Sequence, residues 1–155
     1  MPGTDEFLKT AETLVLYRLR FAWLELSRLF NSEAAKYDGT MSMGFILLTI
    51  NDEYGTPVTR IAPRMGMEPN SLSRILNSMV KKGLVYRRKS ESDKRKVYIC
   101  LTDEGREKRD IALKTVFDME AAITKDISPR KLKAFFEVMG HIPGAIEKFE
   151  EDVEE

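Results

Sequence analysis

The sequence predicts a mainly helical fold of the α+β class, in which one small β-hairpin follows a run of helices. Apolar residues recur at helical spacing over most of the 155 residues. Residues 84–88 and 96–101 are strand-like, and a polar turn separates them. Residues 56–101 therefore hold a short helix, a turn, a longer helix and a hairpin. This order is that of a winged helix-turn-helix.

Length and composition indicate one globular domain, residues 1–155. The chain is 43% hydrophobic and 32% charged, which is typical of a folded protein. Its longest apolar-rich stretch, residues 14–26, is too short and too charged to span a bilayer. The N-terminus shows no signal-peptide pattern, so we expect a cytoplasmic protein without membrane contact. The single cysteine, Cys100, excludes an internal disulfide and a multi-cysteine metal site, and we expect no metal or other cofactor.

Charge is sorted along the chain although its total is zero. Residues 60–96 hold eleven Lys or Arg against three Asp or Glu, a net of +8, so the rest must carry −8. A basic middle between acidic flanks is typical of a surface that faces a polyanion. A solvated basic face is the alternative.

Residues 5–36 are predicted to form one long helix. Its apolar residues repeat every seven positions, and a second apolar set that includes Trp23 and Phe30 lies on another face. A helix that is apolar on most sides must be buried on most sides. We therefore expect a second copy of the chain to cover it, with the central helix of a monomeric bundle as the alternative.

Two short helices are predicted next. The first is capped by Thr40 or Ser42 and runs to about Asp52. The second covers residues 58–65, with Thr56 as its cap.

Pro69 opens the longer helix, and its apolar residues follow the spacing of one buried face. The opposite face carries only amide, hydroxyl and cationic groups, without an acid. Groups of this kind bind base edges and phosphates in the major groove. The face consists of Asn70, Ser73, Arg74, Asn77 and Lys81.

Gly83 ends this helix in the expected left-handed position. The hairpin that follows holds Lys94 and Arg95 at its tip. A cationic tip of this kind can reach a minor groove, where a narrow width concentrates negative potential.

The C-terminal part is predicted as two helices. The first begins after Thr102 as cap and runs to about Lys125. Ser128 caps the second, whose apolar residues follow a heptad pattern typical of helix packing. Pro143 is expected to kink or break this last helix.

Three segments together resemble the MarR family of bacterial transcription regulators. They are Lys82-Gly83-Leu84-Val85, then Asp93-Lys94-Arg95, then Leu101-Thr102-Asp103-Glu104-Gly105. The order of elements is similar to that family from about residue 7 to residue 150.

The resemblance implies a symmetric homodimer that binds double-stranded DNA. Residues 40–101 would form a winged-helix DNA-binding lobe, and residues 5–36 and 102–153 a helical dimerisation region. The recognition helices would enter successive major grooves of a pseudo-palindromic operator, about 34–36 Å apart.

The resemblance also implies residue roles. Arg95 would enter the minor groove, with Lys94 beside it, and Asp93 would hold the loop and orient Arg95. Base and backbone contacts would come from Asn70, Ser71, Ser73, Arg74 and Asn77, and Lys81 lies on the same face.

Members of the family are most often repressors that a small aromatic or anionic ligand releases from DNA. Such an effector would bind between the dimerisation helices and the DNA-binding lobe. The residues that would line this pocket are Tyr17, Phe21, Trp23, Met41, Met43 and Phe45. The alternative is that they belong to the hydrophobic core, which is the more frequent role of apolar residues at helical spacing.

Three positions depart from the family pattern. Glu68 stands where a better helix cap is usual, and Pro63 lies inside the first helix of the pair. The third departure is that Cys100 lies in a wing strand and not in the N-terminal helix, so a packing thiol is favoured over a redox sensor.

An enzyme is not expected, because His141 is the only histidine and no catalytic, phosphate-binding or metal-binding spacing is found. The main alternative to an operator-binding regulator is a winged helix that serves only as a protein-interaction or architectural module.

Overall fold

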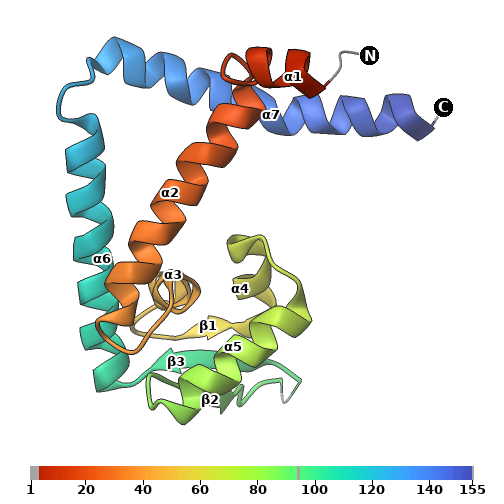
Figure 1. Cartoon of the computed structure of the whole chain (residues 1–155). Coiled ribbons are helices and arrows are strands. Elements are labelled where there is room, and N and C mark those ends of the chain that lie inside the picture. Colours follow the sequence, from red (N-terminus) through yellow and green to blue (C-terminus); the bar gives the residue numbers. More distant parts are fainter. Residues whose placement is uncertain (1–3, 94, 155) are drawn as a thin grey trace. The chain divides into compact units, whose positions relative to one another are not determined.

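The computed structural model describes residues 4–93 and 95–154 (Figure 1). Its contacts divide the chain into two compact units, residues 1–115 and 116–155. The mainly helical class with one small antiparallel sheet is confirmed. Within the described residues the elements are α1 Thr4–Ala11, α2 Val15–Ala35, α3 Met41–Thr49, β1 Thr56–Pro57, α4 Val58–Met65, α5 Pro69–Lys81, β2 Val85–Lys89, β3 Val97–Leu101, α6 Asp103–Thr124 and α7 Pro129–Glu154.

The N-terminal segment is two helices, so the prediction of one helix over residues 5–36 is wrong. The break follows Ala11, where the Thr13 hydroxyl donates to the Thr10 carbonyl at 2.7 Å. Leu14 is extended, with ψ 130°. Arg18 Nε donates to the freed carbonyl of Glu12 at 2.7 Å. Local hydrogen bonds of Thr side chains compete with the helix here, and apolar spacing does not report them.

Helix α3 begins as predicted, because the Thr40 hydroxyl accepts a hydrogen bond from the Met43 amide. Helix α4 spans its predicted residues and ends at Gly66, which is left-handed at φ 58°. Pro63 lies inside α4 without ending it.

Thr56 is not the cap of α4, contrary to the prediction. It belongs to β1, and its hydroxyl donates to the Thr49 carbonyl at 3.2 Å and accepts from the Asn51 amide at 2.8 Å. The cap position is Pro57, which has no side-chain hydrogen bond to offer. The Thr56 side chain therefore links the end of α3 to the segment before α4 through hydrogen bonds.

The core of the first unit lies between α3, α4, α5 and the sheet. Ile46, Ile61, Leu76 and Ile99 are each fully buried and come from these four elements. Burying one such side chain stabilises the fold by about 1.5–3 kcal/mol. The core therefore fixes α5 against the sheet.

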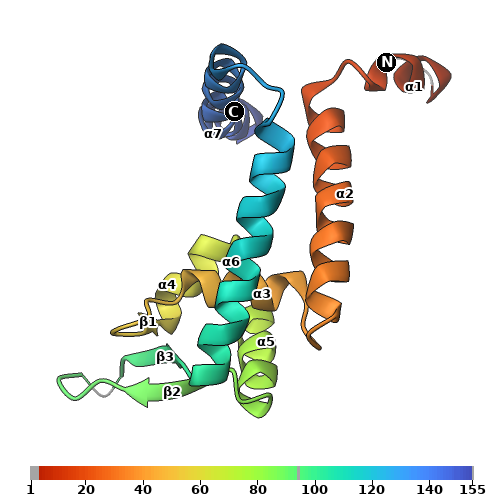
Figure 2. The ribbon, with the colours of Figure 1, turned by 90° about the vertical axis from the view of Figure 1, so that its left-hand side faces the viewer.

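The sheet has the order β1-β3-β2 and is antiparallel throughout. Val85 pairs with Leu101, and Lys89 pairs with Val97. We call the hairpin of β2, β3 and the turn between them, residues 85–101, the wing. Figure 2 shows it projecting beyond α5 and α6.

The base of the wing is held by a close contact with α6. The Thr102 amide donates to the Leu84 carbonyl at 3.1 Å, and the Thr102 hydroxyl accepts from the Gly105 amide at 3.0 Å. A Cβ on Gly105 would lie 1.9 Å from the Leu84 carbonyl oxygen. Thr102 is thus the predicted cap of α6, and Gly105 is required by the close approach.

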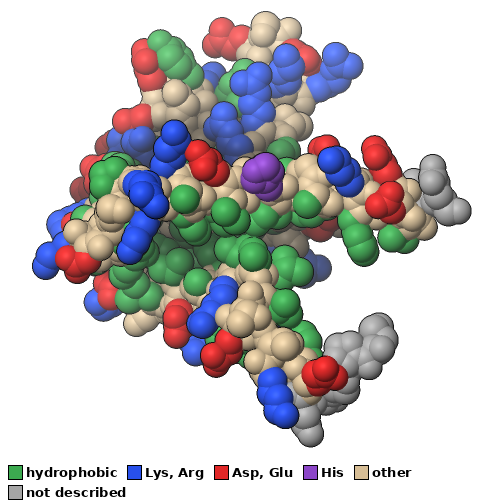
Figure 3. Space-filling model, turned by 90° about the horizontal axis from the view of Figure 1, so that it is seen from above, with side chains coloured by type: hydrophobic (Ala, Val, Ile, Leu, Met, Phe, Trp, Pro, Cys, Tyr) green, Lys and Arg blue, Asp and Glu red, His purple; other side chains and the backbone are tan. Residues whose placement is uncertain are grey.

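The second unit, residues 116–155, consists mainly of α7. The Ser128 hydroxyl accepts from the Lys131 amide at its start, as predicted. The helix continues through Pro143 without a break, and the alternative, a kink at Pro143, stays a prediction. Large apolar side chains gather along one side of it (Figure 3); they include Phe135, Val138, Ile146, Phe149 and Val153, each more than half exposed.

Helix α2 in the first unit is similarly uncovered. No residue of α2 is buried, and Leu16 and Trp23 are 75% and 52% exposed. None of the helices in the described part of the chain has the length and apolarity needed to cross a bilayer.

Candidate nucleic-acid interface

One face of α5 presents the side chains that the sequence predicts as DNA contacts. The buried face of the helix, with Leu72, Leu76 and Met79, fixes its rotation about its axis. The other side therefore faces solvent. Its predicted contact residues are all exposed: Asn70, Ser71, Ser73, Arg74, Asn77 and Lys81.

The start of α5 is weakly capped, as the sequence indicated. Glu68 occupies the cap position without a side-chain hydrogen bond, and Pro69 follows it. The amides of the first turn are therefore open to a ligand or to water.

At the tip of the wing, Asp93 holds Arg95. The Asp93 carboxylate accepts from the Arg95 amide at 3.1 Å and from Arg95 Nε at 3.2 Å. The Arg95 side chain is 93% exposed, so its remaining donors point to solvent. Lys94, the other predicted tip cation, lies outside the described residues.

Two neighbouring arginines of β2 lie on opposite faces of the sheet, because strand side chains alternate. Arg87 Nη1 donates to Asn77 Oδ1 of α5 at 2.9 Å. Arg88 Nη2 donates to the Tyr54 carbonyl at 2.8 Å, and its guanidinium lies 5.2 Å from the centroid of the Tyr98 ring. A hydrogen bond with Cys100 raises the pKa of Arg88. The Arg88 guanidinium is therefore engaged by partners within the protein.

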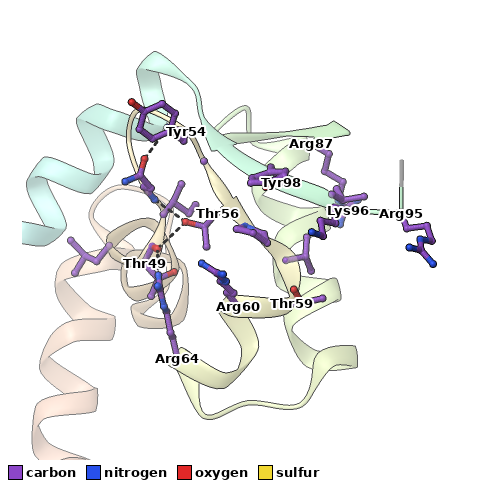
Figure 4. Close-up of a pocket in the computed structure, with 17 residues that line it drawn as sticks. Thr49, Tyr54, Thr56, Thr59, Arg60, Arg64, Arg87, Arg95, Lys96 and Tyr98 are labelled. Carbon is purple, nitrogen blue, oxygen red and sulfur yellow. Dashed lines mark hydrogen bonds between the residues drawn. The ribbon is translucent and has the colours of Figure 1, made fainter. Parts of the chain in front are cut away.

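A hollow of about 980 Å³ lies between the end of α3, the start of α4 and the wing. Figure 4 shows Arg60 and Arg64 rising from α4, with Arg87 and Lys96 at the wing end. Arg95 also lines the hollow. Arg64 Nη1 donates to the Thr49 carbonyl at 3.1 Å, which fixes its direction. Five cations around one hollow create a strongly positive potential that suits phosphate groups.

Four of these cations, Arg60, Arg64, Arg87 and Lys96, were counted in the basic middle of the chain but not singled out as contacts. The sequence spacing indicates part of this cluster of cations, because Arg60 and Arg64 are four residues apart on one helix face. Arg87 shares a face with the apolar Val85, which identifies the side of the hairpin toward α5. The hollow itself depends on how α3, α4 and the wing pack, which sequence spacing does not give.

The predicted effector residues occupy several environments. Met43 is in the core at 9% exposure. Phe45 packs edge-on against Phe30, and Tyr17 lies 4.7 Å from Phe21 between ring centroids. Trp23 is half exposed, and Met41 is half-buried. An effector pocket formed by these residues stays a prediction.

Cys100 is buried in β3. A buried position agrees with a packing role for this thiol. Within the described residues, no three His, Cys, Asp or Glu side chains gather in a way that could hold a metal ion.

Residues 40–97, from the cap of α3 to the start of β3, match the model of the MarR family. This segment is therefore similar to the MarR family. The matched segment contains the exposed face of α5, the wing tip and every residue that lines the hollow except Tyr98. The members of that family are transcription regulators and not enzymes.

Similar proteins agree with this assignment. The HTH-type transcriptional regulator YfiV of Bacillus subtilis strain 168 is 28% identical over 123 residues, covering 75% of this chain and 72% of YfiV. The Staphylococcus aureus MepR–DNA complex is 19% identical with a TM-score of 0.78, covering 85% of this chain and 98% of MepR.

Two further similar structures are of proteins named CouR. The transcriptional repressor CouR bound to a 23-mer DNA duplex is 26% identical with a TM-score of 0.73, covering 86% of this chain and 95% of CouR. CouR from Rhodococcus jostii RHA1 bound to p-coumaroyl-CoA is 20% identical with a TM-score of 0.76, covering 85% and 93%. These structures show that the winged-helix fold is shared.

Proposed function

We propose that this MarR-family regulator binds a pseudo-palindromic operator as a homodimer and acts as a repressor that a small aromatic or anionic effector releases. The observation that carries the proposal is the acid-free face of α5 beside five cations of α4 and the wing. Amide, hydroxyl and guanidinium donors on a helix suit base edges and phosphates of a major groove. Arg95 at the wing tip suits the adjacent minor groove.

Two further observations support the finer parts of the proposal. The uncovered apolar side chains of α2 and α7 need a partner surface, and a second copy would supply one at the proposed dimerisation regions, residues 5–36 and 102–153. The proposed DNA-binding lobe is residues 40–101. One similar structure is of a CouR repressor bound to a DNA duplex, and another is of CouR from Rhodococcus jostii RHA1 bound to p-coumaroyl-CoA.

Selection from a random duplex library, followed by titration at several salt concentrations, tests DNA binding. Contacts to roughly 6–10 phosphates weaken binding by about 10³–10⁵ between about 50 and 200 mM salt. We expect an enriched, inverted-repeat sequence and a steep salt dependence. A chain that binds no duplex, or binds with no dependence on salt, would support the protein-interaction alternative and overturn the proposal.

Effector response is tested separately on the protein–operator complex. Aromatic carboxylates and aromatic acyl-CoA thioesters are the probes, since they supply the proposed chemistry. We expect one class to weaken operator binding and to raise the melting temperature of the free protein by mass action. If neither class changes either quantity, the aromatic or anionic effector is wrong while DNA binding stands.

A further inference from the structure

We propose that Asn77 contributes to DNA binding through Arg87 and does not read a base itself. Asn77 is a positioning residue that holds the Arg87 guanidinium toward a phosphate. This inference rests on the proposed function, because it concerns how the same surface grips DNA. It also changes the role expected for Asn77 from its place on the exposed face of α5.

The contact joins two elements that are rigidly packed on each other. Val85, on the same face of β2 as Arg87, is 2% exposed and belongs to the core beneath α5. Arg87 lies two residues further along that face, beyond the buried part of the strand, and is exposed. Its Nη1 reaches Asn77 Oδ1 at 2.9 Å. The core therefore fixes the backbones of the two elements that carry this hydrogen bond.

The hydrogen bond occupies the atom that base reading would need. An asparagine that reads adenine accepts from the base N6 amino group with Oδ1 and donates to N7 with its amide nitrogen. In this structure Oδ1 of Asn77 already accepts from a cation. Hydrogen bonds with one charged partner are stronger than neutral ones. Reading adenine would require this bond to be shared or broken.

Arg87 keeps donors for a second partner. A guanidinium has five N–H donors in a planar fork, and one of them is directed at Asn77. Arg87 also lines the hollow that Arg60, Arg95 and Lys96 line. Several cations around one hollow match a phosphate backbone better than a single base edge.

Neighbouring residues show that this arrangement is particular to Arg87. Arg88 is held by the Tyr54 carbonyl and the Tyr98 ring on the other side of the sheet. Arg74, on α5 with Asn77, makes no hydrogen bond or ion pair with any residue in the described ranges, so its whole fork is open to a base. Arg74 is thus the natural comparison for a base-reading residue.

The test is a double-mutant cycle of Asn77→Ala and Arg87→Ala. The duplexes are the selected operator, its single base-pair variants and an unrelated sequence. At about 100 mM salt, Arg87→Ala should lower affinity roughly fivefold to tenfold on every duplex and reduce the salt slope by about 0.9. Asn77→Ala should cause a loss no larger than this, equal on every duplex. In the Arg87→Ala background, Asn77→Ala should change affinity by less than about twofold.

Lys89→Ala is the matched control, since Lys89 is an exposed cation of the same strand with no side-chain partner among the described residues. Its effect should add to that of Asn77→Ala without coupling. Thermal denaturation of each variant shows that the fold is kept. Arg74→Ala should flatten preference at one base pair, which Asn77→Ala should leave unchanged.

Two results would overturn the inference while DNA binding stands. One is that Asn77→Ala abolishes preference at a particular base pair, as a base reader would. The other is that Asn77→Ala and Arg87→Ala act independently. If the wild-type protein binds no duplex at all, the proposed function fails as well, so the two failures are distinguishable.

Discussion

Gly105 is the single residue whose identity the structure explains most directly. Its Cα faces the Leu84 carbonyl so closely that an added Cβ would lie 1.9 Å from the oxygen. That oxygen also accepts from the Thr102 amide. The glycine of the Leu-Thr-x-x-Gly segment therefore has a physical explanation: the start of α6 packs closely against Leu84, the last residue before the wing.

Gly105→Ala should destabilise the protein by about 1–3 kcal/mol, because α6 must shift away from the Leu84 carbonyl. Urea denaturation followed by circular dichroism measures this. Gly44→Ala is the control, since its Cβ would meet Ala112 at an ordinary 3.6 Å; an alanine in a helix should be neutral or slightly stabilising there. Equal stabilities for the two variants would contradict the close contact.

Arg95→Ala should weaken binding to the operator and to unrelated duplex by similar factors. In its proposed role, the Arg95 side chain responds to the negative potential of a groove more than to a particular base. Asp93→Ala should have a smaller effect in the same direction, because it releases the Arg95 side chain without removing its charge. Fluorescence anisotropy with both duplexes provides the measurement. A loss confined to the operator would show that Arg95 reads sequence.

Arg74→Ala should lower operator affinity by about 1–3 kcal/mol while largely sparing unrelated duplex, as expected for a fork that binds a base edge. The measurement is a panel of single base-pair variants of the operator. Preference that is unchanged at every position would exclude base reading by Arg74.

At the scale of elements, the sequence was most informative where apolar spacing and helix ends agree. Helix α5 has Pro69 at its start, Gly83 just past its end and one apolar face between them, so its bounds were predicted closely. The helix break after Ala11 is not predicted, because it arises from hydrogen bonds of threonine hydroxyl groups while the apolar spacing continues across it. Strand β1 was missed because two residues are too few to show alternation.

The candidate site divides in the same way. The face of α5 follows from helical spacing, and the Asp93–Arg95 contact was expected from the family resemblance. The pairing of Asn77 with Arg87 joins residues of different elements. Only the packing of α5 on the sheet brings them together, so no spacing within either element contains it.

Another contact between elements gives a prediction about pH. Lys82, just past α5, forms an ion pair with Asp38 in the α2–α3 turn. A hydrogen bond from Lys82, helped by its charge, lowers the pKa of Asp38 below its ordinary 3.8. The pair therefore stabilises the fold above pH 3.8, and this contribution disappears as pH falls through the lower pKa of the folded state.

Asp38→Asn should consequently lower the urea midpoint at neutral pH, and the difference from the wild type should disappear in acid once the Asp38 carboxyl is protonated in the folded state. Asparagine suits the site because Asp38 has a positive φ of 56°, which it tolerates. The effect should be small and sensitive to salt, since the pair is exposed. Asp126→Asn, at an exposed position with no ion pair among the described residues, is the control. A midpoint difference that persists in acid would contradict this pair as the cause.

At the scale of the molecule, charge and apolar surface occupy different parts of the chain. The cations gather on α4, α5 and the wing, while large apolar side chains stay uncovered on α2 and α7. This separation is what a regulator needs if one surface meets DNA and the others meet a second copy.

Phe149→Asp tests the second surface. Phe149 is 70% exposed on α7, and each protomer would lose about 1.5–3 kcal/mol of apolar burial in a dimer. We expect sedimentation equilibrium to show dissociation at concentrations where the wild type is dimeric. Lys148→Asp changes the charge at an already polar neighbour and should leave the dimer intact. If both variants match the wild type in mass, α7 does not contribute to the dimer through Phe149.

The order β1-β3-β2 leaves the sheet with two edges whose backbone groups are free to pair with another strand. One edge is only two residues long and ends at Pro57, which has no N–H to donate. The other carries three consecutive cations, Arg87, Arg88 and Lys89. The cationic β2 edges of two separate molecules repel each other, and this repulsion opposes edge-to-edge aggregation at high concentration. The charges that we propose attract DNA would thus also keep the wings of separate molecules apart before any DNA is bound.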